Sequence, residues 1–271
     1  MKIFKEPAKL QAWSLKQRLA GRKVALVPTM GYLHEGHLSL IAAAKRKGAD
    51  EIVVSVFVNP VQFCPGEDYE KYPRDEKADL EKCRAAGATA IFFPTPANMY
   101  LDRHSVYVNE EDLSSGLCGA RRPGHFRGVC TVVAKLFNLA HPNFAVFGQK
   151  DFQQVQVIRR MVRDLNFDLK IVVAPIVREP NGLARSSRNT YLSDEEREKA
   201  LAISRSLKAV KAGKLTLAGV NKALEAAGLR VDYVECVDAE TLEPRKRPQK
   251  GTCVLVAAYA GKTRLIDNIL V

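Results

Sequence analysis

The chain has 271 residues and a formal net charge of +12, from 42 Lys and Arg residues against 30 Asp and Glu residues. A hydrophobic fraction of 46% is enough to pack one large domain or two ordinary ones. The longest apolar runs, such as residues 52–58, are much shorter than the ~20 residues that cross a bilayer, and the first residues lack an apolar signal core. We therefore expect a cytoplasmic protein that does not associate with membranes.

The basic composition leaves two classes of partner open, nucleic acids and polyanionic small substrates. The densest basic run, Arg245-Lys-Arg-Pro-Gln-Lys250, contains no aromatic residue and is typical of a solvated loop. We expect no nucleic-acid partner. An RNA-binding module is the alternative from another class, and salt-sensitive RNA binding would be its mark.

The cysteines form no metal or disulfide pattern. No two are spaced as C-x-x-C, which argues against a zinc ribbon, a thioredoxin-type site and a disulfide framework. We expect small buried side chains or unreactive thiols at Cys64, Cys83, Cys118, Cys130, Cys236 and Cys253.

The first two-thirds of the chain alternate between short apolar runs and helical patterns. We predict strands at 24–28, 52–58, 90–93, 144–147 and 169–176, with helices at about 37–47, 76–86, 128–140 and 152–165. Strands that alternate with crossover helices form a mostly parallel, doubly wound sheet. The predicted class is therefore α/β with a Rossmann-like sheet.

The last third has a different pattern. Ser193-Asp-Glu-Glu196 forms a capping box that opens a long helix, and Gly213 can end it. A helix at 217–226 and strands at 231–237 and 253–258 follow. We predict a Rossmann-like domain at 1–176 and a smaller α+β domain at 177–271, with the boundary just before the Pro180-Asn181-Gly182 turn.

The strongest local signal is Val27-Pro-Thr-Met-Gly-Tyr-Leu-His-Glu-Gly-His37, between the first predicted strand and the first predicted helix. In a doubly wound sheet, ligands bind at the carboxyl ends of the strands. A helix N-terminus there offers free backbone N–H groups and the positive end of a dipole, both suited to phosphate. His34 and His37 can point the same way from this helix start, while Gly31 and Gly36 let the backbone approach a ligand closely.

Other kinds of site fit this segment less well. A zinc protease would space its histidines as H-E-x-x-H, and no third ligand is evident. No G-x-G-x-x-G fingerprint is present, and Gly261-Lys-Thr263 lacks the earlier glycine of a Walker A loop. Two ordinary histidines at a helix start are the alternative when the segment is considered alone.

Two further segments carry groups suited to phosphate. Arg185-Ser-Ser-Arg-Asn189 has adjacent hydroxyls flanked by guanidinium groups, which donate charge-assisted hydrogen bonds and keep their charge while pyrophosphate leaves. In Phe147-Gly-Gln-Lys-Asp-Phe-Gln-Gln154, Lys150 suits phosphate and Asp151 suits a ribose hydroxyl. The alternatives are a solvated loop for the first segment and an exposed ion pair for the second.

A fourth segment, Phe57-Val-Asn-Pro-Val-Gln-Phe63, follows the second predicted strand. Asn59 and Gln62 are neutral donor–acceptor groups among apolar residues and suit a small polar ligand, with a capped turn as the alternative. All four segments lie at predicted strand ends, where this fold class binds ligands. The pattern by itself therefore predicts an ATP-using α/β enzyme and leaves its other substrates open.

An H-x-G-H segment early in an α/β chain and a serine- and arginine-containing loop late in it resemble the nucleotidyltransferases with H-I-G-H and K-M-S-K-S motifs. The full set of segments is more specific and resembles the pantothenate synthetase family, in order along nearly the whole chain. These segments are Pro28-Thr-Met-Gly with His34-Glu-Gly-His37, Phe57-Val-Asn-Pro with Gln62-Phe63, Arg122-Pro-Gly-His-Phe-Arg-Gly128, Phe147-Gly-Gln-Lys-Asp and Ser186-Ser-Arg-Asn189.

The resemblance implies a two-step ligation in pantothenate biosynthesis, on the route to coenzyme A. Pantoate attacks the α-phosphorus of ATP, pyrophosphate leaves, and β-alanine then attacks pantoyl-adenylate and releases AMP. The resemblance also implies a need for Mg²⁺, whose ligands it does not identify, and a homodimer formed through the N-terminal domain. Because an acyl-adenylate must be shielded from water, we expect the C-terminal domain to act as a lid.

Carried onto matching positions, the resemblance makes His34, His37, Lys150 and Arg188 catalytic, and it makes Gln62 and Gln154, with Asn59 nearby, the residues that bind pantoate. It assigns ATP binding to Met30, Gly31, Tyr32, Leu33, His34, Glu35, Gly36, His37, Gly148, Gln149, Lys150, Asp151, Val177, Arg185, Ser186, Ser187 and Arg188.

Two positions depart from the family pattern. Arg185 stands where the family often has methionine and adds charge beside the phosphate loop, and Cys118 stands where it often has glutamate and removes an acid near Arg122. Neither change touches the matched histidines, lysine or glutamines, so we expect activity to be retained. Another nucleotidyltransferase of the same superfamily is the alternative enzyme, and it would not catalyse pantoate-dependent pyrophosphate exchange.

Overall fold

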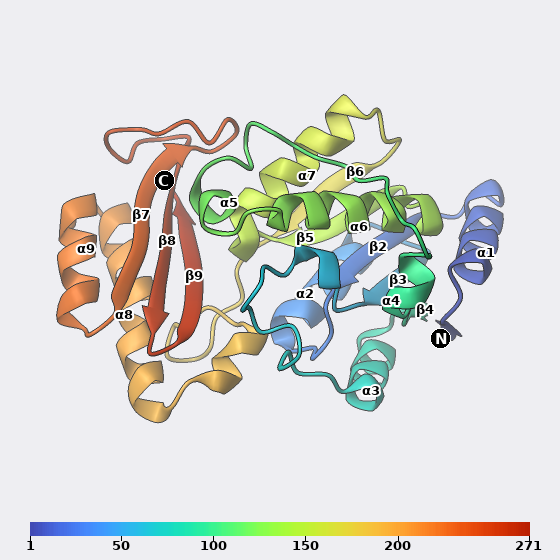
Figure 1. The fold of residues 1–271 in the computed structure, drawn as a ribbon, viewed down its shortest axis with the longest axis horizontal. Coiled ribbons are helices and arrows are strands. Elements are labelled where there is room, and N and C mark those ends of the chain that lie inside the picture. Colours follow the sequence, from blue (N-terminus) through green and yellow to red (C-terminus); the bar gives the residue numbers. More distant parts are fainter. The chain divides into compact units, whose positions relative to one another are not determined.

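The computed structural model describes all 271 residues, and they form two compact units (Figure 1). The first unit consists of Met1–Gly148 and Val157–Ala174. The second consists of Gln149–Gln156 and Pro175–Val271.

The first unit is built on a six-stranded sheet in the order β1-β4-β3-β2-β5-β6, with every neighbouring pair parallel. The strands are β1 (Lys2–Phe4), β2 (Val24–Thr29), β3 (Glu51–Val56), β4 (Ala90–Phe92), β5 (Phe144–Gly148) and β6 (Lys170–Ala174). This order confirms the predicted doubly wound α/β class, because the chain moves outward from β2 in one direction and later returns to its other side.

Helices cover both faces of this sheet (Figure 1). α2 (Glu35–Arg46) and α3 (Glu76–Ala86) lie together on one side, and α1 (Pro7–Leu19) and α6 (His125–Ala140) pack together on the other. The shorter helices of this unit are η1 (Pro60–Gln62), α4 (Pro96–Met99) and α5 (Leu117–Arg121), and α7 (Phe152–Asp164) enters it from residue 157 onward.

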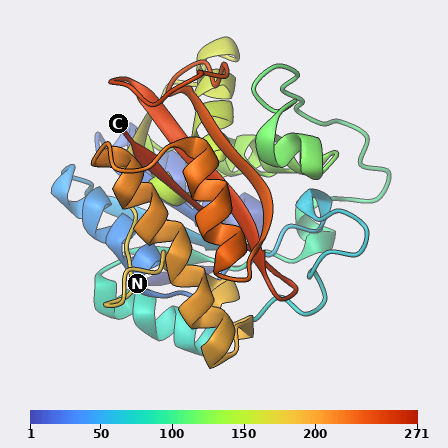
Figure 2. The ribbon, with the colours of Figure 1, turned by 90° about the vertical axis from the view of Figure 1, so that its left-hand side faces the viewer.

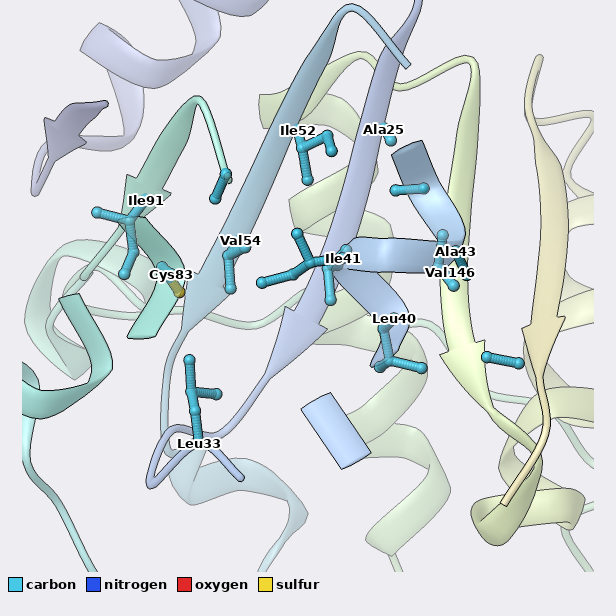
Figure 3. Close-up of a cluster of buried hydrophobic side chains, with 14 of the residues drawn as sticks. Ala25, Leu33, Leu40, Ile41, Ala43, Ile52, Val54, Cys83, Ile91 and Val146 are labelled. Carbon is cyan, nitrogen blue, oxygen red and sulfur yellow. The ribbon is translucent and has the colours of Figure 1, made fainter. Parts of the chain in front are cut away.

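The core beneath α2 fixes where this helix begins. Alternate residues of β2, Ala25 and Val27, face α2 and are fully buried. Figure 3 shows Ile41 of α2 among Ile52 and Val54 of β3. Strands buried on both faces need apolar residues throughout, which is why these strands are nearly continuous Val, Ile, Leu and Ala runs. The packed core holds α2, and so its N-terminus, against the sheet.

Most predicted elements of the first unit are confirmed, and the differences have local causes. α6 begins at His125 rather than Gly128, and its N-cap is Gly124. Gly128 lies inside the helix, where a Cβ would lie 2.5 Å from the carbonyl oxygen of Val61 in η1. β1 and α1 were not predicted. β1 has only three residues, and α1 buries only Leu10 and Ser14, so neither gives a clear periodic pattern.

The second unit contains an antiparallel sheet in the order β7-β8-β9. α8 (Asp194–Lys211) and α9 (Leu217–Ala226) lie side by side on one face of it (Figure 2). The predicted capping box is confirmed, since Ser193 Oγ accepts from Glu196 N and the Glu196 carboxylate accepts from Ser193 N. The strands are β7 (Arg230–Asp238), β8 (Thr252–Ala260) and β9 (Thr263–Leu270), and the short helices are η2 (Gln149–Asp151) and η3 (Ser187–Tyr191).

β9 was not predicted as a strand. Asp267 and Asn268 interrupt its apolar alternation, yet both are buried because each bonds to another segment of the second unit. Arg178 donates to the two oxygens of Asp267 at 2.6 and 3.0 Å. A rule that assigns polar residues to the surface therefore does not predict the burial of polar groups that have such partners.

Five of the six cysteines are buried, as predicted, and Cys64 is half-buried. No helix combines the length and the apolar content needed to cross a membrane. No group of three or more His, Cys, Asp or Glu side chains is arranged to hold a metal ion.

Candidate active site

Two of the predicted segments leave the first unit's sheet at the carboxyl ends of neighbouring strands. Residues 30–37 follow β2 and residues 57–63 follow β3, and these strands pair in parallel from Val24↔Glu51 to Thr29↔Val56. β2 also pairs with β5 on its other side, so it is the strand at which the winding reverses. Such a switch point is where open α/β sheets bind ligands.

His34 and His37 form the N-terminus of α2. His34 is the N-cap residue: its Nδ1 accepts from Gly36 N at 3.1 Å, and His37 Nδ1 accepts from His34 N at 3.3 Å. The two ring centroids are 4.1 Å apart. Because a backbone N–H can only donate, both Nδ1 atoms lack a proton, and each neutral ring carries its proton on Nε2. The helix start therefore holds two imidazoles that donate through Nε2.

A buried carboxylate supports the loop before α2. Asp79 of α3 is 1% exposed, and its oxygens accept from Tyr32 N at 2.8 Å and Leu33 N at 2.7 Å. These bonds hold a backbone that turns sharply, with φ of 87° at Gly31 and 51° at Tyr32. Burial raises the pKa of Asp79, although the two backbone hydrogen bonds oppose the rise. Asp79 is thus an internal support for residues 30–34.

Asn59 and Gln62 lie at the two ends of the turn after β3. Asn59 Nδ2 donates to Gln62 Oε1 at 3.0 Å, and Gln62 Nε2 lies 3.2 Å from Met30 Sδ. The two residues are 1% and 9% exposed. The structure therefore brings the 57–63 segment into contact with the 30–37 segment through Gln62 and Met30.

A second set of side chains holds the backbone of Gln62. His125 Nδ1 bonds to the Gln62 carbonyl at 2.8 Å, and Arg122 Nη1 to His125 Nε2 at 2.9 Å. Since arginine only donates, Nε2 of His125 is the acceptor and Nδ1 carries the proton. Glu67 accepts from Arg122 at 2.5 and 2.7 Å. Burial opposes ionisation of Glu67, but the hydrogen bonds and charge of Arg122 outweigh it and hold the pKa below its usual value.

In the second unit, residues 149–151 are attached to β9. Asn268 Nδ2 donates to Gln149 O at 2.9 Å and Lys150 O at 3.0 Å, and Asn268 Oδ1 accepts from Gln149 Nε2 at 3.1 Å. The ammonium group of Lys150 lies 3.2 Å from Asp151 Oδ1, so the ion pair considered from the sequence is present. Gln154 follows in the first turn of α7. The backbone of Lys150 is thus fixed by β9.

The 185–189 segment turns into η3. Ser186 is the N-cap residue, its Oγ accepts from Arg188 N at 3.3 Å, and Ser187 is buried. Arg185 N donates to Val177 O at 2.9 Å, across a hairpin whose turn has Gly182 at φ of 101°. The predicted turn is therefore present, and it returns the chain beside Val177.

Glu179 provides negative charge beside this loop. Its carboxylate accepts from Arg185 Nη1 at 3.3 Å, Asn189 Nδ2 at 2.9 Å and Arg197 Nη1 at 2.8 Å. Burial opposes ionisation of Glu179, but the bonds from Asn189 and Arg197 outweigh it and lower the pKa. The charge that Arg185 adds is therefore partly offset.

The model of the pantoate-beta-alanine ligase family matches residues 2–270. The chain belongs to the pantoate-beta-alanine ligase family. A pantothenate synthetase from Myxococcus xanthus is 54% identical, over 98% of this chain and 95% of its own length. One from Thermotoga neapolitana is 49% identical, over 100% of this chain and 99% of its own length.

Solved structures of the ligase family have the same fold. Pantothenate synthetase from Thermus thermophilus aligns with a TM-score of 0.91 at 45% identity, covering 99% of both chains. The Francisella tularensis pantoate-beta-alanine ligase, solved in complex with "Beta-gamma ATP" and β-alanine, aligns with a TM-score of 0.87 at 33% identity and covers 100% of this chain and 97% of that one.

The departures from the pattern of the ligase family have counterparts in the structure. Cys118 is buried, and the acidic partner of Arg122 is Glu67.

Glu67, Asp79 and Asn268 were not predicted from the sequence, because the groups they hold are 55, 46 and 118 residues away. For Asp79, a carboxylate on the otherwise buried side of a predicted helix was the available signal.

Proposed function

We propose that the chain condenses pantoate with β-alanine, using ATP, to give pantothenate, AMP and pyrophosphate. The observation that carries this proposal is the match of the ligase family over residues 2–270. The F. tularensis ligase, solved with an ATP compound and β-alanine, supports the same substrates for this chain.

The reaction we infer has two displacements. A carboxylate oxygen of pantoate attacks the α-phosphorus of ATP, the bond to the bridging oxygen breaks, and pyrophosphate leaves. The amine of β-alanine then attacks the acyl carbon, the bond to AMP breaks, and the amine loses a proton. Charge shifts onto phosphate oxygens in both displacements, so the protein has mainly to place donors and cations.

His34 and His37 are proposed to bind ATP phosphates. Each Nδ1 accepts a backbone hydrogen bond in the cap of α2, which leaves Nε2–H as the donating side of the ring. The first turn of α2 adds the positive end of its dipole. We propose that Met30 to His37, with Glu35 and Gly36 in the first helical turn, border the nucleotide.

Lys150, Ser186, Ser187 and Arg188 are proposed to neutralise the developing charge. In support, Asn268 holds the backbone of Lys150, so phosphate would compete only with Asp151 for a positioned ammonium group. We also propose Gly148, Gln149, Asp151, Val177 and Arg185 at the nucleotide.

Gln62 and Gln154 are proposed to bind pantoate, with Asn59 close to them. Gln62 is a buried amide next to Met30. Such a neutral amide in an apolar setting favours a small hydroxy acid over ligands that lack the matching oxygen, because those ligands would leave the amide without a hydrogen-bond partner.

We further propose Mg²⁺ as the partner ion of ATP. In proteins this ion is usually held by substrate phosphates, waters and one or two carboxylates, and it would offset phosphate charge. We propose residues 177–271 as a lid and the cytoplasm as the location, as the family resemblance implies. A homodimer formed through the first unit is also proposed, and eight of the ten exposed large hydrophobic residues belong to that unit.

AMP release from ATP and Mg²⁺, with pantoate and β-alanine each omitted in turn, tests the function. We expect sustained AMP release only with both, and pyrophosphate exchange into ATP with pantoate alone. His37→Ala and Lys150→Ala should each lower turnover at least ~100-fold without unfolding the protein. Pyrophosphate exchange that does not depend on pantoate, or a product that keeps the nucleotide, would instead indicate another nucleotidyltransferase.

A further inference from the structure

Tyr100 lies outside every predicted site segment but contacts one of them. It follows α4, and its hydroxyl donates to Asn59 Oδ1 at 2.7 Å. Its ring packs edge-on against His104, with centroids 5.0 Å apart, and near Phe57, at 6.4 Å. The phenol group is therefore fixed at both its ring and its hydroxyl.

Asn59 uses its whole hydrogen-bonding capacity inside the protein. Its Oδ1 accepts from Tyr100 and, at 3.3 Å, from Val61 N. Its Nδ2 donates to Gln62 Oε1 at 3.0 Å and Gly128 O at 3.1 Å. An asparagine amide has two lone pairs and two hydrogens, so all four are used. Because Val61 N can only donate and Gly128 O can only accept, the orientation of the amide is determined by its partners.

This orientation decides which group Gln62 presents. Since Gln62 Oε1 accepts from Asn59, Nε2 points away from Asn59 and lies beside Met30 Sδ. A thioether is a weak acceptor and Nε2 carries two hydrogens. Gln62 therefore offers a donor, which suits a carboxylate or hydroxyl oxygen of a bound acid.

Tyr100 makes the shorter of the two bonds to Asn59 Oδ1, at 2.7 Å against 3.3 Å from Val61 N. Burial is the main reason that the pKa of Tyr100 lies well above its usual value. The hydroxyl thus stays protonated at any pH at which the enzyme works, and it remains a donor.

We propose that Tyr100 is a positioning residue for the acid substrate: it anchors Asn59, whose amide keeps the Gln62 amide turned so that its nitrogen donates to an oxygen of pantoate. This inference rests on the proposed function, in which Gln62 binds pantoate. It also gives Asn59 a positioning role, because no donor or acceptor of its amide remains for a ligand.

Tyr100→Phe removes the hydroxyl and keeps the ring. We expect KM for pantoate to rise about 5- to 10-fold, the loss of one hydrogen bond, with kcat within about 2-fold and KM for ATP unchanged. Tyr107→Phe is the matched control: this nearby tyrosine stacks on Arg127 and has no bond to Asn59, and its KM for pantoate should be that of the wild type.

A double-mutant cycle distinguishes positioning from a general structural effect. In a Gln62→Ala background, Tyr100→Phe should lower kcat/KM for pantoate no further, because the group that it orients is gone. Equal losses in both backgrounds, or an unchanged KM for pantoate in Tyr100→Phe, would overturn the proposal. A wild-type protein that releases no AMP with pantoate and β-alanine would instead refute the proposed function itself.

Discussion

Replacing Gly128 by Ala tests whether packing of α6 on η1 sets the position of Gln62. A Cβ on Gly128 would lie 2.5 Å from Val61 O and 2.6 Å from Gln62 N and Cα. All three are backbone atoms, so no side-chain rotation relieves the contact. Reaching the 3.4 Å of ordinary contact requires a shift of 3.4 − 2.5 Å, or 0.9 Å. A displacement of about 1 Å at a binding group costs up to about 100-fold in rate, and we expect kcat/KM for pantoate to fall about 10- to 100-fold.

The stability of the same variant should change less than its activity. Ala is favoured over Gly inside a helix by about 1 kcal/mol, whereas overpacking costs about 1–3 kcal/mol. We therefore expect a net loss of at most about 2 kcal/mol in the free energy of unfolding, measured in urea. AMP release at varied pantoate gives kcat/KM.

Gly116→Ala is the steric control for this variant. A Cβ at Gly116 meets no atom within 4 Å, so we expect its kcat/KM for pantoate to equal that of the wild type. If Gly128→Ala kept the wild-type kcat/KM and gained the ~1 kcal/mol of helix propensity, the argument from close packing would be refuted.

Variants at three further residues test groups around the site. His34→Ala removes the cap of α2 and should lower the free energy of unfolding by about 1 kcal/mol, whereas His34→Ser keeps a capping oxygen and should lose less. Urea unfolding measures this difference, and both variants should lose activity in the AMP assay. Asp79→Asn leaves one of two backbone N–H groups without an acceptor, so urea unfolding should show a loss of about 1–3 kcal/mol, and an unchanged midpoint would contradict that role. Glu67 has a lowered pKa when folded, so its contribution to stability is present above its unfolded pKa of about 4.3 and is lost as the pH falls through the folded value. Glu67→Gln should therefore show a flatter fall in unfolding free energy below about pH 4.5 than the wild type does, and an identical fall would count against the pairing with Arg122.

Local patterns made much of the fold predictable. The parallel strands are buried on both faces, so β2 and β3 appear in the sequence as short apolar runs followed by polar turns. His34 and Asn59 lie in the turns that follow these runs, and both segments were predicted because ligands bind at the carboxyl ends of parallel strands. The sheet class and the confirmed helices of both units were therefore predictable from residues close together in the chain.

Side chains that act over long sequence distances were not predictable. Tyr100 bonds to Asn59 across 41 residues, and Asp79 bonds to Leu33 across 46. Tyr100 stands in no pattern that differs from an ordinary loop, and the only local signal at Asp79 is a carboxylate on the otherwise buried side of a helix. Asn268 looked like an interruption of a strand, because its partners at Gln149 and Lys150 are more than 100 residues earlier. Burial of such groups depends on the tertiary structure, which a local pattern does not contain.

Because Gln149–Gln156 belong to the second unit, one cut in the chain cannot separate the two units. The chain passes between the units three times, after Gly148, after Gln156 and after Ala174. A fragment that starts at Pro175 would keep Asn268 but lose the two carbonyls that its amide binds, leaving buried donors without acceptors. Circular permutants or split forms of this enzyme should therefore keep residues 149–156, which include Lys150, in the same piece as β9.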